Sequence, residues 1–141
     1  MNYKQMTAPC GRDCFNCPFY LATKNDKYKK IIAQKYEIKH EDVPCNGCKN
    51  IEGQCNFLKS IGFSTQCKIY KCSSEKNVDF CYECNEFPCD LLHPLADQAD
   101  KLPHNLKIFS LCQIKKMGLE TWAQNKAKES FEKYYKDKLD L

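Results

Sequence analysis

The chain has 141 residues, 12 cysteines and a formal net charge of +4. This length fits one ordinary domain, so we expect a single domain over residues 1–141, with a cysteine-rich metal-binding part at about 8–92 and a helical part at about 93–141. The charge is weak support for nucleic-acid binding, because it counts every cysteine as a neutral thiol and metal-bound thiolates would cancel most of it.

The density of cysteines indicates either a disulfide scaffold or a metal scaffold, and the expected compartment decides between the two. No apolar stretch of the kind found in secretion signals precedes Cys10, and no window approaches the roughly 18 apolar residues of a membrane span. We therefore expect a cytoplasmic protein without a membrane partner. Thiols stay reduced in the cytoplasm, so the clustered cysteines are expected to bind metal or to take part in redox chemistry.

The first cysteines lie in a tight turn, Cys10-Gly-Arg-Asp-Cys14-Phe-Asn-Cys17-Pro, in which a glycine and a proline exclude a regular helix or strand. All three thiols of this turn are candidate metal ligands. From Phe19 to Tyr36 the apolar residues recur at helical spacing with lysines between them. This pattern predicts an amphipathic helix whose lysines form its solvated face.

A polar connector over residues 37–44, which contains His40, leads to a knuckle formed by Cys45 and Cys48. In such a knuckle the two intervening residues let both sulfurs point at one ion about 2.3 Å away. The glycine of this knuckle supplies the left-handed conformation that the turn often needs. Both cysteines are therefore candidate metal ligands.

Cys55 follows in a glycine-containing segment, where it is either a further metal ligand or a small buried residue. Residues 57–63 are expected to form one or two helical turns that end at Gly62. This segment separates the first knuckle from the richest cluster of thiols.

Five thiols follow in one stretch, around which we expect the rest of the chain to be organised: Cys67, Cys72, Cys81, Cys84 and Cys89. Cys81 and Cys84 form a second knuckle. Cys89 precedes a predicted helix over residues 89–99, and the dipole at the start of a helix favours a thiolate.

Two helices are predicted in the last third of the chain. The first spans residues 105–117 and is followed by Gly118, which lies where a C-cap glycine belongs. It contains Cys112, which we expect to be a buried core residue because its neighbours are apolar. The second helix extends from residue 119 to about 139. The predicted fold is small, metal-stabilised and mostly α, with irregular cysteine-rich loops and zinc knuckles packed with about three to four helices.

The spacing of the cysteines indicates which of them share an ion. Cys45 and Cys48, followed after eighteen residues by Cys67 and Cys72, match the pattern of a structural tetrathiolate zinc site. Two triads remain, each one ligand short of a tetrahedron: Cys10, Cys14 and Cys17, and Cys81, Cys84 and Cys89. Their missing ligands could come from exchange between the triads or from Cys55, His40, His93, His104 or solvent. We expect two or three zinc ions.

An iron–sulfur cluster is the alternative cofactor. Cys10-x3-Cys14-x2-Cys17 has the spacing with which radical S-adenosylmethionine enzymes bind a cluster, but those enzymes need a large βα barrel that this chain is too short to form. A small electron-transfer protein remains open as an alternative. A brown protein with absorbance near ~400 nm would favour it.

Several motifs occur together in a fixed order: Cys-Gly-x-x-Cys-x-x-Cys-Pro-x-Tyr at 10–20, Cys-x-Gly-Cys at 45–48, Cys-x-Ile-x-x-Cys at 67–72 and Cys-x-Glu-Cys-x-x-Phe-Pro-Cys at 81–89. Together with Gly118-Leu119-Glu120 and Trp122, this set resembles a bacterial and archaeal family catalogued as domain of unknown function 3795. The resemblance covers roughly residues 8–123.

Members of that family are described as probable zinc binders without an established activity, so the resemblance implies metal binding and architecture more than function. Ten cysteines carry over by position: Cys10, Cys14, Cys17, Cys45, Cys48, Cys67, Cys72, Cys81, Cys84 and Cys89. Relatives often have a further cysteine where this chain has Ser64, and Cys55 is a candidate to substitute for it.

The sequence therefore predicts a small cytoplasmic zinc-binding protein with structural tetrathiolate sites, acting as a binding or regulatory module for a protein or a small molecule. The alternatives are an iron–sulfur or thiol redox protein, or an enzyme with an open three-cysteine metal site. No catalytic motif is recognisable among the three histidines, which argues against ordinary acid–base catalysis. Nucleic-acid binding is favoured by the lysines but lacks the spacing of a zinc finger.

Overall fold

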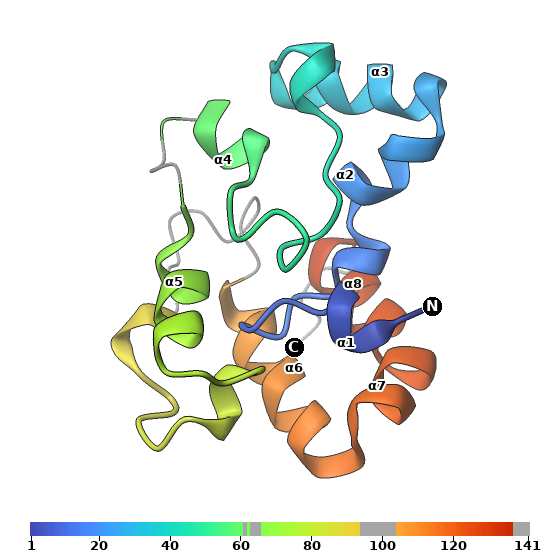
Figure 1. Cartoon of the computed structure of the whole chain (residues 1–141). Coiled ribbons are helices and arrows are strands. Elements are labelled where there is room, and N and C mark those ends of the chain that lie inside the picture. Colours follow the sequence, from blue (N-terminus) through green and yellow to red (C-terminus); the bar gives the residue numbers. More distant parts are fainter. Residues whose placement is uncertain (61, 63–65, 94–103, 137–141) are drawn as a thin grey trace.

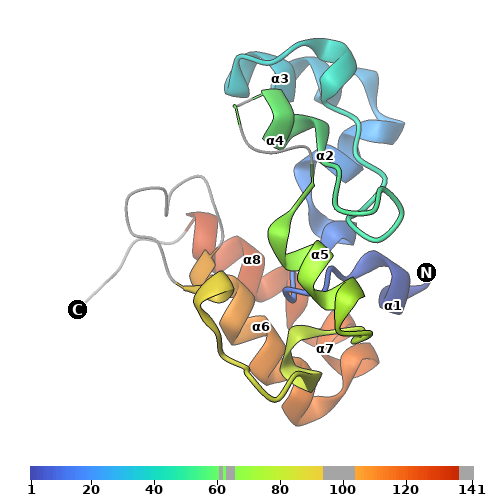
Figure 2. The same cartoon turned by 60° about the vertical axis from the view of Figure 1, so that its left-hand side comes forward.

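The computed structural model describes residues 1–60, 62, 66–93 and 104–136 of the chain. These parts are mostly helical, as predicted, and they contain no β-strand, although an isolated antiparallel bridge pairs Thr7 with Asp13. The N-terminus lies beside α1 and α7, α3 and α4 lie at one end of the molecule, and α6 and α7 lie at the other end (Figures 1 and 2). None of the helices in the described parts is both long and apolar enough to cross a bilayer.

The N-terminal third is a series of short helices rather than one long helix. In chain order they are α1 (Tyr3–Met6), the 3-10 turn η1 (Cys14–Asn16), α2 (Pro18–Leu21), the 3-10 turn η2 (Ala22–Lys24) and α3 (Asp26–Tyr36). The single helix predicted from Phe19 to Tyr36 is therefore wrong. The chain is extended at Asn25, whose side chain accepts a hydrogen bond of 2.9 Å from the backbone N–H of Tyr28 and so starts a new helix.

The middle of the chain alternates loops and short helices: η3 (His40–Asp42), α4 (Asn56–Ser60), α5 (Lys68–Glu75), η4 (Cys81–Glu83) and η5 (Asp90–Leu92). The helical turns predicted near residues 57–63 correspond to α4, and Gly62 has a left-handed φ of 86°. Of the helix predicted over 89–99, only the turn η5 falls within the described residues. Helix α5 was not predicted.

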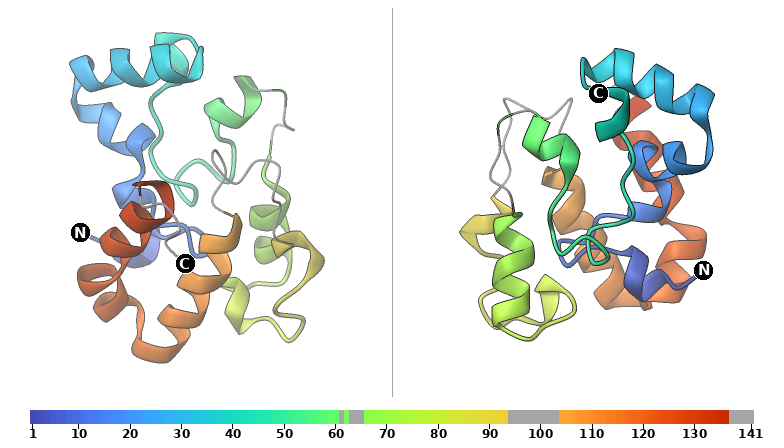
Figure 3. Two further views of the ribbon diagram at one scale, coloured as in Figure 1. Left: turned by 180° about the vertical axis from the view of Figure 1, so that it is seen from behind. Right: turned by 45° about the horizontal axis from the view of Figure 1, so that its top comes forward.

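The last part consists of α6 (His104–Met117), α7 (Leu119–Asn125) and α8 (Ala127–Lys136). The predicted break at Gly118 is confirmed, since this residue has a φ of 84°. The single helix predicted from residue 119 to about 139 is wrong, because the chain leaves helical geometry at Lys126, with φ −127° and ψ −31°. Residues 137–139 lie outside the described part. The break folds α8 back so that α6, α7 and α8 pack on one another (Figure 3).

The prediction that Cys112 is a buried core residue is also wrong, because its side chain is exposed. The buried face of α6 contains Leu111 and Ile114, which expose 0% and 2% of their surface. Cys112 follows Leu111 directly and is rotated by about 100° around the helix, which takes it off that face. Apolar residues occur on several sides of α6 itself, so the sequence alone does not indicate which side of the helix is buried.

One hydrophobic core joins the cysteine-rich and helical parts. Trp122 on α7 is almost fully buried and packs edge-to-face against Phe15, with ring centroids 6.2 Å apart. Phe15 in turn contacts Tyr3 at 5.1 Å. A second, smaller cluster lies between α2, α3 and the segment before the first knuckle: Phe19, Ala22, Ile32 and Val43. Cys10 and Cys14 belong to the larger cluster, so thiols form part of the core.

Candidate metal-binding thiols

The cysteines are all reduced, and eleven of them fall into three groups by their contacts and electrostatic neighbours. Group I is Cys10, Cys14, Cys48 and Cys67. Group II is Cys72, Cys81, Cys84 and Cys89. Group III is Cys17, Cys45 and Cys55. The twelfth, Cys112, stands apart on the surface of α6.

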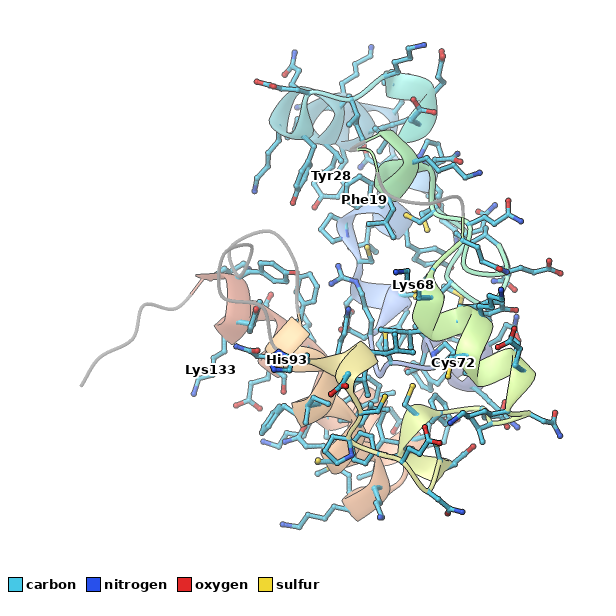
Figure 4. The ribbon with its side chains drawn as sticks, turned by 90° about the vertical axis from the view of Figure 1, so that its left-hand side faces the viewer. Phe19, Tyr28, Lys68, Cys72, His93 and Lys133 are labelled. Atoms are coloured by element: carbon cyan, nitrogen blue, oxygen red, sulfur yellow. The ribbon has the colours of Figure 1, made fainter. Side chains whose placement is uncertain are left out.

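The four thiols of group II line one small cavity, together with apolar side chains from α5, from η5 and from the segments on either side of η4. Cys72 lies on α5, which brings it next to the knuckle at η4 (Figure 4). Lys76, one turn further along α5, donates to Cys84 Sγ at 3.6 Å and to the Glu86 carboxylate at 2.6 Å. A positive charge therefore lies beside the sulfurs.

The group II thiols are electrostatically coupled. Burial and, after it, the neighbouring thiols Cys10, Cys89, Cys72 and Cys84 together raise the pKa of Cys81 to about 12. The cause is that each additional thiolate in this apolar setting repels the others. Without a cation, the Cys81 thiol therefore stays protonated at neutral pH.

Group I is brought together by backbone hydrogen bonds between distant segments. The N–H of Cys48 donates to Cys14 Sγ at 3.4 Å. Gly53 joins the other two segments, because its N–H donates to the carbonyl of Cys48 at 2.9 Å and its carbonyl accepts from the N–H of Cys67 at 3.0 Å. Gly53 has a φ of 73°, and a Cβ there would lie 2.7 Å from Tyr70 Cβ. This position therefore requires glycine.

In group I the pKa values of Cys14 and Cys48 are raised. Burial raises the pKa of Cys14 to about 12, although the hydrogen bond from Cys48 opposes this shift. Burial and then the neighbours Cys10, Cys14 and Cys67 raise the pKa of Cys48 well above its ordinary value. The N–H of Cys81 donates to the carbonyl of Pro9 at 2.9 Å, which places groups I and II side by side.

In group III the neighbouring side chain of Cys55, followed by burial, raises the pKa of Cys45 well above its ordinary value. Cys17 is the third thiol. It accepts a hydrogen bond of 3.6 Å from Arg12.

Arg12 connects group III to the helical part of the chain. Its guanidinium donates to the hydroxyl of Tyr135 on α8 at 3.3 Å and lies 5.8 Å from the ring centre of Phe131. Burial disfavours the charged guanidinium, but Cys17 and Tyr135 raise the pKa of Arg12 well above its ordinary value. Within the described residues no carboxylate pairs with Arg12 at ion-pair distance.

Cys72, which spacing grouped with Cys45, lines one cavity with Cys81, Cys84 and Cys89. Cys17 is an electrostatic neighbour of both Cys14 and Cys45, so it lies between groups I and III. In the described parts of the chain no three His, Cys, Asp or Glu side chains lie close enough to one another to hold a metal ion. The three groups are therefore defined by which thiols are neighbours and, for group II, by one common cavity, and not by metal–ligand distances.

Two of the histidines considered as further ligands have described side chains. His40 pairs with Asp26, with 3.3 Å between Nε2 and Oδ1. His93 lies apart from Cys72 in Figure 4. The side chain of His104 is outside the described part.

Sequence reasoning missed the two cations that contact thiols, Arg12 and Lys76. Arg12 lies between Cys10 and Cys14 in the first turn, and a cation within a cluster of cysteines is a usable signal. Lys76 lies four residues after Cys72, a spacing that becomes informative only once α5 is recognised as a helix.

The amino-acid sequence matches the model of a protein family. Residues 6–94 match the family described as Protein of unknown function (DUF3795). Comparison with curated proteins and with solved structures finds no match. The matched segment extends over well more than half of the chain and contains all three groups of thiols. The chain therefore belongs to this family of proteins of unknown function.

Proposed function

We propose that this chain is a zinc-binding protein in which groups I and II each hold one ion through four thiolates. The observation that carries the proposal is the cavity of group II, which four cysteines from α5, η4 and the following loop line together. Four thiolates in a tetrahedron are the usual ligand set of a structural zinc site.

The chemistry of the donors fits a divalent, thiol-preferring ion. The sulfurs of Cys81 and Cys84 belong to a short knuckle, and Cys72 and Cys89 lie on the elements that flank it. A tetrathiolate zinc site carries a net charge of −2, and Lys76 beside Cys84 would compensate part of it. Group I offers the same number of thiols, with the N–H of Cys48 directed at the Cys14 sulfur.

The proposed role of the two ions is structural. Four protein ligands leave no position for a substrate, so neither site offers the open coordination that metal-assisted hydrolysis requires. Each structural zinc contributes roughly 10–16 kcal/mol in finger-type peptides at neutral pH, which is enough to order loops that bury few aliphatic side chains. In the reducing cytoplasm the chain would serve as a binding or regulatory module for a protein or a small molecule.

Elemental analysis of protein purified without added metal tests this proposal. We expect two zinc ions per chain. Cys72→Ser and Cys14→Ser should each lose one ion, since each removes a ligand from a different group. Cys112→Ser is the matched control and should retain both ions, because Cys112 is exposed and outside the groups. Protein without metal would refute the proposal, and a brown protein containing iron and sulfide would replace it with a cluster.

A further inference from the structure

We propose that the groove between α6 and α8 binds a mononucleotide. This inference goes beyond the two proposed zinc sites, because it concerns the helical part of the chain and uses none of the thiols in groups I, II and III. It gives a chemical class for a small-molecule ligand, which the zinc sites leave open.

The groove is large enough for such a ligand. Its volume is about 480 Å³, whereas the cavity lined by the group II thiols has a volume of about 30 Å³. Pockets that bind small organic molecules usually measure about 300–1,000 Å³. Of these two cavities, the groove is therefore the one that accommodates an organic molecule.

One face of each helix forms the groove. Residues three or four positions apart lie on the same side of a helix. The side chains that line the groove from α6 and from α8 follow this spacing: Leu106, Phe109 and Gln113 on α6, and Ser130, Lys133 and Tyr134 on α8. The groove is therefore a continuous surface built on two regular elements that pack on each other.

Aromatic rings from both helices suit a nucleobase. Phe109 on α6 leaves 50% of its surface exposed. On α8, Tyr134 packs edge-to-face against Tyr135 at 5.1 Å, and Tyr135 in turn accepts a hydrogen bond from Arg12. A base that stacks on an aromatic side chain covers exposed apolar surface, and such stacking tolerates any base because every base has a planar face.

The charges of the groove favour an anion. The described residues that line it include two lysines, Lys126 and Lys133, and one carboxylate, Glu129. Lys126 pairs with Glu129 at 3.0 Å, and within the described parts no carboxylate lies at ion-pair distance from Lys133. Lys133 is exposed and lies well apart from Cys72 in Figure 4. A phosphate in the groove would pair with its ammonium group.

A side-chain amide in the groove suits the hydrogen-bonding edge of a base. Gln113 lines the groove, and its Oε1 atom is buried without a hydrogen-bond partner among the residues described. A buried acceptor that lacks a donor is unfavourable. Rotation of this amide toward the groove would let it bind the N–H groups and acceptors of a base, a pairing that glutamine makes with bases elsewhere.

The test is calorimetric titration of the full chain, as purified, with the monophosphates of adenosine, guanosine, cytidine and uridine. We expect at least one of them to bind. Its nucleoside and ribose 5-phosphate should each bind at least about tenfold more weakly, because the first lacks the phosphate and the second lacks the base. These comparisons use the unmodified chain and so do not depend on the folding of a variant.

Two substitutions separate the contacts. Lys133→Gln should weaken the nucleotide about tenfold and leave the nucleoside unchanged, since it removes only the charge. Phe109→Ala should weaken both the nucleotide and the nucleoside. Lys128→Gln is the matched control, because Lys128 is an exposed lysine of α8 that does not line the groove, and it should leave both affinities unchanged.

Three results would overturn the inference. The first is that none of the nucleotides binds at millimolar concentration. The second is equal weakening by Lys133→Gln and Lys128→Gln, which would mean attraction by net charge alone. The third is a Phe109→Ala chain that is folded by circular dichroism and binds the nucleotide unchanged. The titration requires no metal, so its result and the metal content show separately whether the groove or the zinc sites are wrongly assigned.

Discussion

The helices of residues 104–136 and the loops of residues 1–93 bury side chains against the same core, but their backbones are organised by different means. In α6, α7 and α8 the hydrogen bonds run within each helix and between consecutive helices. In the first part, bonds such as Cys81 N–H to the Pro9 carbonyl join segments far apart in the sequence. Closing those long loops costs more conformational entropy than forming contacts between residues that are close in the sequence.

The two parts also differ in the side chains that they contribute to the core. The helical part contributes Leu111, Ile114 and Trp122 to the core, and all three side chains are almost completely buried. The first part contributes apolar side chains such as Phe15, Phe80 and Leu92 to the same cluster, and with them the thiols Cys10 and Cys14. Thiols are small, so they bury less apolar area than leucine or tryptophan. We infer that the first part depends on bound ions and the helical part on packing.

Metal removal should give the largest effect and tests this comparison directly. A strong chelator should unfold residues 1–93, because each structural zinc contributes roughly 10–16 kcal/mol, comparable to the whole stability of a domain. Circular dichroism should show loss of helix, and hydrogen exchange should show protection lost first in the cysteine-rich part and later in α6. Earlier loss of protection in α6 than around the thiols would contradict the comparison.

Removal of the largest core side chain is expected to come next. Trp122→Ala should destabilise the protein by about 3–5 kcal/mol, since it leaves a cavity against Phe15. Chemical denaturation measures the change. Phe109→Ala is the control on α6, because Phe109 is half exposed, and its effect should stay within about 0.5 kcal/mol. Equal effects of the two substitutions would show that the shared core does not join the two parts.

The sequence predicts the helical part well where local signals are strong. The apolar pattern and Gly118 define α6 and its end, and the structure confirms both. The breaks at Asn25 and Lys126 were missed because apolar spacing continues across them, while the capping side chain of Asn25 acts locally. The buried side of α6 was not predictable either, which is why Cys112 was misplaced.

The sequence predicts the thiol-rich part less completely, for a physical reason. Spacing identifies knuckles, since both members lie on one short loop. It does not show which distant segments meet, because that depends on bonds such as the two made by Gly53 with Cys48 and Cys67. Helix α5 was also missed, and with it the reason that Cys72 lies beside Cys81.

Two glycines allow a matched test of that junction. Gly53 and Gly118 have φ values of 73° and 84°, so an alanine at either position should cost roughly 1–2 kcal/mol of backbone strain. A Cβ at Gly53 would also meet Tyr70 at 2.7 Å, whereas nothing lies within 4 Å at Gly118. Gly53→Ala should therefore cost about 1–3 kcal/mol more in chemical denaturation and should release zinc more readily. Equal costs would mean that Gly53 does not organise group I.

The contact between Arg12 and Tyr135 links the first turn to α8 and should have a smaller effect. The hydrogen bond of 3.3 Å should contribute about 0.5–1.5 kcal/mol to stability. A double-mutant cycle with Arg12→Met and Tyr135→Phe isolates it, because the cycle cancels what Arg12 separately provides to Cys17. Additive single effects would show that α8 is held without this bond.

The ion pair of Lys4 with Asp79 joins α1 to the segment before η4 and should contribute least. The atoms are 2.6 Å apart, but about half of each side chain or more is exposed, so the contribution should be small and should fall at high salt. Lys49 Nζ lies 3.7 Å from the same carboxylate, so Asp79→Asn removes both ion pairs. The hydrogen bond from Lys4 lowers the pKa of Asp79 below 3.8. Because the pKa of Asp79 is lower in the folded than in the unfolded chain, its carboxylate stabilises the fold at pH values above its pKa in the unfolded chain. This stabilisation is lost as the pH falls through its pKa in the folded chain. The stability difference between the natural chain and Asp79→Asn should therefore be present at neutral pH in low salt, shrink in high salt and disappear in acid. A difference that is insensitive to salt would show that Asp79 acts through its backbone neighbours rather than through its charge.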